Sequence, residues 1–166
     1  MNLVSLICMV ALNPAGYPGG MEREVPPPQV ALMAVHALKI GRNERGCWEA
    51  QMKYGIRLVY IPPGSFDMGS PAGEPGREDD EGPVRRIHLD GYWIGKYEVT
   101  GATWKAIRHH TPSAVRTGGD DFPVSNVSWD EAQAFIKGLN RVSGVTYRLP
   151  TEAEWERACR AGTSGP

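Results

Sequence analysis

The sequence has few cysteines, no excess of positive charge and no long hydrophobic run. Its 166 residues include three cysteines, Cys8, Cys47 and Cys159, an odd number with no CxxC pair and no zinc-like spacing. A disulfide framework or a structural zinc site is therefore disfavoured. Lysine and arginine total 18 against 19 acidic residues, for a formal net charge of −1. Such a chain lacks the field that holds a phosphate backbone, which disfavours nucleic-acid binding as its main activity.

The longest apolar stretch, Leu3–Leu12, is far shorter than the roughly 20 residues that a transmembrane helix requires. It has the length of the apolar region of a signal peptide, but no lysine or arginine precedes it, and the first basic residue is Arg23. The compartment therefore stays open between secretion and the cytoplasm, and the missing basic residue slightly favours the cytoplasm.

Glycine and proline are abundant, with 20 and 14 residues, which indicates many turns and argues against a helical bundle. The length suits one domain. The composition changes near residue 56, so we expect residues 1–56 to form an extension or linker and residues 57–166 a domain. Within the extension, the apolar segment Val30–Ile40 predicts one short helix.

Short strands come first and short helices later, a pattern that predicts an α+β fold. Ser128 and Thr151 each begin a capping box, with Glu131 and Glu154 three residues on, and Thr100 is a further N-cap. Glycines close the two capped helices, at Gly144 and Gly162. We expect strands at Leu58–Ile61, Phe66–Gly69, Arg85–Leu89 and Tyr92–Val99, where apolar or β-branched residues predominate.

Several segments resemble, in the same order, the family of formylglycine-generating enzymes, or sulfatase-modifying factors. One such match would be weak, but together they extend over residues 57–166. The matching segments are Ile61–Phe66, Met68–Ser70, Asp80–Pro83, Arg86–Leu89, Tyr92–Thr100, Pro123–Trp129 and Tyr147–Glu156.

This resemblance implies an elaborated C-type-lectin-like α+β fold, rich in loops. It also implies the family's chemistry, in which two thiolates hold copper(I) and oxygen oxidises a cysteine of a sulfatase peptide to formylglycine. The family's calcium ions lie mostly on loops of the second half of the domain. We expect this chain to end, at Pro166, about halfway through the domain and before the cysteine pair, and hence to be inactive alone. A smaller departure is Gly101, where the family usually has asparagine.

We assign no catalytic, cofactor-binding or metal-binding residue in this chain. Cys159 is expected to be a buried structural thiol, and the His109–His110 pair a solvated helix end. The acidic segment Glu74–Glu81 is expected to be a solvated loop, because it lacks the ligand spacing of a calcium loop. Two further groups receive structural roles: Trp104, Trp129 and Trp155 in core packing, and Glu98 and Arg148 in buried or half-buried ion pairs.

Two other functions remain open. A non-catalytic, lectin-like binding module of the same family is the main alternative. A place in the branch that serves ergothioneine-type sulfoxide synthesis is weaker, because nothing here resembles its iron-binding helical domain. A sulfatase peptide is the expected partner of the complete domain, and the oligomeric state stays open. Half a domain would leave apolar residues such as Phe135 and Leu139 partly uncovered.

Overall fold

The computed structural model describes residues 10–11, 27–109 and 119–163, and within them two antiparallel sheets. Six strands form one sheet in the order β2-β3-β4-β7-β1-β8, and β5 pairs with β6 in a separate ribbon. The strands are β1 (Val10–Ala11), β2 (Lys39–Arg42), β3 (Trp48–Gln51), β4 (Arg57–Ile61), β5 (Gly64–Met68), β6 (Arg85–Leu89), β7 (Tyr92–Gly95) and β8 (Tyr147–Arg148). The helices are α1 (Pro28–Ala34), α2 (Gly101–Arg108), α3 (Trp129–Ser143) and α4 (Glu152–Arg160), with 3₁₀ turns at Lys53–Gly55 and Asp79–Glu81.

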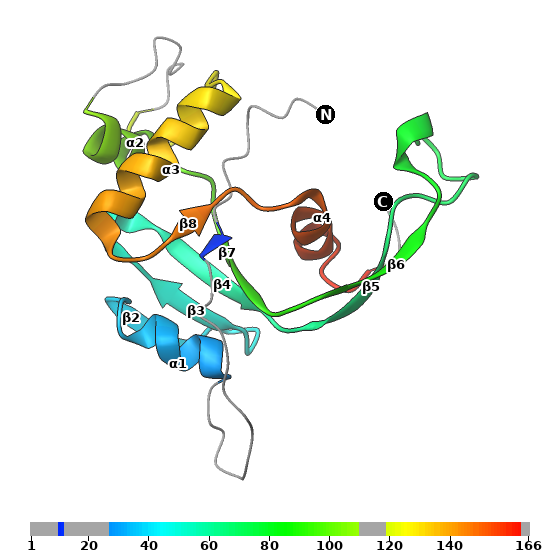
Figure 1. The fold of residues 1–166 in the computed structure, drawn as a ribbon, viewed down its shortest axis with the longest axis horizontal. Helices are drawn as coiled ribbons and strands as arrows, with labels where there is room; N and C mark the ends of the chain where they lie inside the picture. The colour runs from blue at the N-terminus through cyan, green and yellow to red at the C-terminus, as the bar shows by residue number, and fades with distance from the viewer. Residues whose placement is uncertain (1–9, 12–26, 110–118, 164–166) are drawn as a thin grey trace.

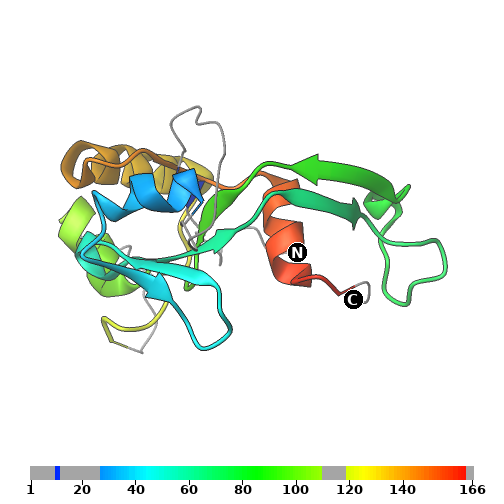
Figure 2. The ribbon, with the colours of Figure 1, turned by 90° about the horizontal axis from the view of Figure 1, so that it is seen from below.

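The helices α1, α2 and α3 gather at one end of the molecule, around the larger sheet (Figure 1). The β5–β6 ribbon curves away toward the other end, and α4 lies within its curve (Figures 1 and 2). This arrangement, with short strands, short helices and many loops, confirms the predicted α+β fold class.

Local sequence explains the helix ends. At α3, the Ser128 side chain accepts a hydrogen bond from the Glu131 amide, and the Glu131 carboxylate accepts from the Ser128 amide. Thr151 and Glu154 repeat this capping box at α4. Gly144 closes α3 in the left-handed conformation, with φ of 74°. The capping boxes and the Gly144 stop are thus confirmed. In contrast, α4 ends at Arg160, and its left-handed C-cap is Ala161, one residue before the predicted Gly162.

The main core lies between the larger sheet and the helices. Trp104 of α2 stacks on Phe135 of α3, with ring centroids 5.0 Å apart, and both side chains are 0% exposed. Leu139 is also 0% exposed. The expectation that Phe135 and Leu139 would be partly uncovered was therefore wrong, because α2 and the sheet cover this face of α3 within the chain itself.

Residues 28–56 pack into the same core as the segment that follows. Val30 and Met33 of α1 are buried, and β2 and β3 continue the sheet from β4. The predicted helix over Val30–Ile40 is shorter than expected, because it ends at Ala34 and Lys39 begins a strand. Most of the apolar stretch Leu3–Leu12 lies outside the described residues. In the described part of the chain, every helix is too short or too polar to cross a bilayer.

Candidate functional site

A charged cluster joins β8 to α4. The Arg148 guanidinium donates two hydrogen bonds to the Glu154 carboxylate, at 2.7 and 2.5 Å, and the Thr151 amide donates a third at 2.8 Å. Glu154 is 7% exposed. Burial raises the pKa of this carboxyl, but the bonds from Arg148 and Thr151 outweigh it and leave the pKa below its usual value. The same pairing raises the pKa of Arg148.

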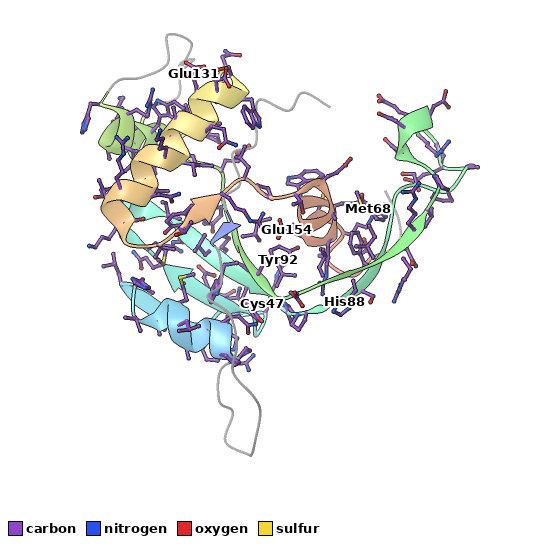
Figure 3. The ribbon with its side chains drawn as sticks, viewed as in Figure 1. Cys47, Met68, His88, Tyr92, Glu131 and Glu154 are labelled. Atoms are coloured by element: carbon purple, nitrogen blue, oxygen red, sulfur yellow. The ribbon has the colours of Figure 1, made fainter. Side chains whose placement is uncertain are left out.

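Helix α4 also fastens the β5–β6 ribbon by its charged side chains. Glu156 accepts a hydrogen bond from the Gly69 amide, and Arg160 donates to the Gly69 carbonyl, both at 2.9 Å. Arg157 donates to the carbonyls of Pro62 and Leu89, at 2.7 and 3.3 Å. Figure 3 shows Tyr92 directed toward this helix, and its hydroxyl donates to the Glu154 carbonyl at 2.6 Å. These polar side chains of α4 are thus already hydrogen-bonded within the chain. They hold the loops beside β5 and β6 in place.

A groove of about 520 Å³ opens beside the ends of β4 and β7, and it is the candidate binding site. Arg57 lines it from β4, and Asp121 lines it from the segment between α2 and α3. Lys96, Tyr97 and Glu98 line it from the loop after β7. Tyr97 is 60% exposed, so an apolar ring is available to a ligand.

Glu49 of β3 pairs with two cations that line this groove. Lys96 Nζ lies 2.7 Å from one Glu49 oxygen, and Arg57 lies 3.7 Å from the other. The hydrogen bond from Lys96 lowers the pKa of Glu49, and the same bond raises the pKa of Lys96. The sequence analysis missed this site, since Glu49 and Lys96 are far apart in the chain and Glu49 lay in the segment assigned to the extension.

The two described cysteines are both exposed and free, Cys47 in the turn between β2 and β3 and Cys159 on α4. The prediction that Cys159 is buried was wrong. Helix α4 packs through Trp155 and Ala158 on Tyr92 and Ile94, and this contact turns the thiol of Cys159 to solvent. Cys8 lies outside the described residues.

Of the thiols that could hold copper(I), the two described ones, Cys47 and Cys159, lie on the β2–β3 turn and on α4. The described residues also contain no cluster of three or more histidine, cysteine, aspartate or glutamate side chains placed to hold a metal. His109 is exposed at the left-handed C-cap of α2, which confirms a solvated helix end, and His110 lies outside the described residues. The segment Glu74–Glu81 is largely exposed, as predicted, and Glu81 accepts a hydrogen bond from Ser70 Oγ at 2.7 Å.

The remaining structural roles were predicted with mixed success. Trp104 is buried and Trp155 partly so, but Trp129 is 63% exposed as the first residue of α3, and its predicted core role was wrong. Arg148 has its partner in Glu154, six residues on. Glu98 is half-buried and forms no ion pair with another described residue, so the ion pair predicted for it was wrong.

The four helices and two small sheets of the described residues define a loop-rich α+β domain. Residues 49–166 match the family model of the sulfatase-modifying factor enzyme 1-like domain, and the chain belongs to this family.

Individual relatives agree with this family. The mouse (Mus musculus) formylglycine-generating enzyme is 27% identical over 64% of this chain and 40% of its own length. The inactive C-alpha-formylglycine-generating enzyme 2 of Bos taurus is 24% identical over 66% of this chain and 50% of its own length. The solved structure of PvdO from Pseudomonas aeruginosa superposes with a TM-score of 0.63 at 25% identity, over 78% of this chain and 54% of PvdO. The chain thus spans about half, or less, of the proteins that it matches. That the fold of this domain is C-type-lectin-like stays a prediction.

Proposed function

We propose that this chain is the structural, non-catalytic part of a sulfatase-modifying domain, whose complete form oxidises a sulfatase cysteine to formylglycine. We also propose that the chain alone lacks this activity. The family match and the relation to the mouse enzyme support the reaction class. One observation carries the second half of the proposal: Cys47 and Cys159, the described thiols, lie exposed on a hairpin turn and on α4. A copper(I) site of the family type needs two thiolates at one ion.

The test uses the full chain, copper(I), oxygen and a cysteine peptide derived from a sulfatase, with the mouse formylglycine-generating enzyme as the positive control. Aldehyde is measured by capture with a hydroxylamine probe and mass spectrometry. We expect aldehyde from the mouse enzyme and none from this chain. Aldehyde formed by this chain alone would overturn the proposal.

The second candidate is a non-catalytic binding module, and the groove beside β4 and β7 favours it. Its wall offers the exposed Tyr97 ring and the carboxylates of Glu98 and Asp121. The relation to an inactive family member is consistent with binding without oxidation.

The same sulfatase peptide, with a fluorescent label, distinguishes the two candidates by anisotropy. A binding module should hold the peptide in the absence of copper, and Tyr97→Ala should weaken binding about tenfold because the aromatic contact is lost. Trp129→Ala is the matched control, since Trp129 is exposed on α3 and does not line the groove. Equal binding by both variants would exclude the groove, and absence of binding would remove this candidate.

A further inference from the structure

The larger sheet contains a position that the chain fills with a strand of two residues. The strand β1 lies between β7 and β8 and is antiparallel to both. Val10 faces Ile94 and Arg148, and Ala11 faces Trp93 and Tyr147. Neighbouring strands lie 4.7–4.9 Å apart, so β7 and β8 are separated by about 9–10 Å, the space of one strand.

The two strands that border this space, β7 and β8, are also held by contacts that do not involve β1. On one side, β7 pairs with β4 over four residues, and its Trp93 is 0% exposed. On the other side, the Asn140 amide of α3 takes the place of a neighbouring strand for β8. It donates to the Tyr147 carbonyl at 3.0 Å and accepts from the Tyr147 amide at 2.8 Å.

The backbone groups that face the space follow from strand geometry. Consecutive residues of a strand direct their N–H and C=O groups to opposite sides. Tyr147 directs its groups to Asn140, so Arg148 directs its own toward β1. The Lys96 amide donates to the Arg57 carbonyl on the β4 side, so Trp93, three residues earlier, faces β1. Both walls therefore present backbone groups that need a partner when they are shielded from water.

We propose that the space between β7 and β8, the acceptor slot, binds an extended apolar segment in trans as well as in cis, and that its trans partner is the same N-terminal segment of a second copy of this chain. The segment is identical in both copies, so the register that fits in cis also fits in trans. Residues 12–27, which join β1 to α1, can span roughly 50 Å when extended, long enough to reach a neighbouring molecule. Exchange of an identical element between copies is a low-cost route to a dimer.

Weakening β1 of the same chain makes its exchange with β1 of a second copy measurable. The strand β1 pairs through two residues on each side, whereas β7 and β4 pair through four, so β1 is the weakly held strand of this part of the sheet. Ala11→Pro in the full chain removes the backbone N–H that faces Trp93 and weakens the in-cis strand. Ala15→Pro, four residues further on, is the matched control with the same substitution outside β1.

The probe is a fluorescent peptide with the sequence of residues 3–13, in which Cys8→Ser prevents disulfide exchange. By anisotropy, we expect the Ala11→Pro chain to bind this peptide at least tenfold more tightly than the wild-type chain, because its slot is free of the competing strand. The Ala15→Pro chain should behave as the wild type. A peptide that itself carries Ala11→Pro should bind at least tenfold more weakly. By analytical ultracentrifugation, the wild-type chain should form a dimer with rising concentration, and the Ala11→Pro chain should form less.

Four results would overturn the proposal. The first is a folded Ala11→Pro chain that does not bind the peptide, and the second is equal binding of the two peptides. The third is an Ala11→Pro chain that fails to fold and that the peptide does not restore. The fourth is a wild-type chain that is monomeric at every concentration. Recovery of the near-UV circular dichroism of an unfolded Ala11→Pro chain on addition of the peptide would support it.

Discussion

Through one side chain, Glu154 joins β8, the start of α4 and the turn between them. Its oxygens accept from Arg148 and from the amide and hydroxyl of Thr151. A buried carboxylate that receives several donors is costly to remove, because the donors then lose their partner in a place that water reaches poorly.

Replacement of this carboxylate tests its role in stability. We expect Glu154→Gln to lower the free energy of unfolding by about 2–4 kcal/mol, because the buried pair with Arg148 is broken. Urea unfolding followed by tryptophan fluorescence measures the change. Glu152→Gln, on the exposed side of the same helix turn, is the control and should change it by less than about 0.5 kcal/mol. Equal effects of the two variants would contradict the role given to Glu154.

The lowered pKa of Glu154 also predicts a pH dependence. A carboxyl whose pKa is lower in the folded state stabilises the protein above its unfolded pKa, near 4.5, and this contribution is lost as the pH falls through the folded value. The wild-type chain should therefore lose stability below about pH 4.5 more steeply than Glu154→Gln. Urea midpoints measured from pH 6 to pH 3 give the two slopes, and parallel slopes would argue against a lowered pKa.

Exposure of Cys159 can be tested directly. In the native chain, Ellman's reagent should modify Cys159 at a rate close to that of Cys47, because both thiols are exposed. Single-cysteine variants separate the two signals. Modification of Cys159 only after addition of urea would show that the thiol is buried after all.

At the scale of elements, α4 and the β5–β6 ribbon depend on one glycine. Gly69 has φ of +95°, and a Cβ there would lie 2.5 Å from the carbonyl oxygen of Glu81. Glu156 and Arg160 hold the same residue through its amide and carbonyl. The close backbone approach and the left-handed conformation together require glycine at this position.

Gly69→Ala should therefore destabilise the chain by at least about 2 kcal/mol, through a steric conflict and an unfavourable backbone conformation. Gly73→Ala is the control, because a Cβ at Gly73 meets no atom within 4 Å. Thermal unfolding followed by circular dichroism compares the two variants. Similar melting temperatures would mean that the ribbon adapts to the added methyl group.

At the scale of the whole molecule, the described residues enclose their own core. Trp93, Trp104 and Phe135 are each 0% exposed, and α1, α2, α3 and the larger sheet all contribute to the cluster. Because this core is large and closed, we expect cooperative unfolding. We expect it even though the chain spans about half, or less, of the length of its relatives.

Cooperativity can be measured with two signals. Near-UV circular dichroism and tryptophan fluorescence should give coincident urea transitions, and Phe135→Ala should lower the free energy of unfolding by about 3–5 kcal/mol. Trp129→Ala, at an exposed position, should have an effect within about 0.5 kcal/mol. Separate transitions for the two signals, or strong dye binding by the native chain, would indicate a core that is not closed.

Features that depend on residues a few positions apart could be predicted from the sequence. The capping boxes at Ser128 and Thr151, the stop at Gly144 and the buried face of α3 follow from local hydrogen bonds and helical spacing. The motifs from Ile61 to Glu156 also carried the family resemblance. The caps and the helix stop each depend on one short segment, and the resemblance depends on several short segments in order, so no distant contact is needed to recognise them.

Only the tertiary structure decided which surfaces meet. The exposure of Cys159 depends on the face that α4 turns to Tyr92 and Ile94. The ion pair beside the groove likewise joins distant residues, Glu49 of β3 and Lys96 after β7. The place of Val10–Ala11 between β7 and β8 likewise depends on strands from distant parts of the chain. Helical periodicity makes a face apolar, but the neighbour that covers it is selected by packing between segments far apart in sequence, where local propensity has no influence.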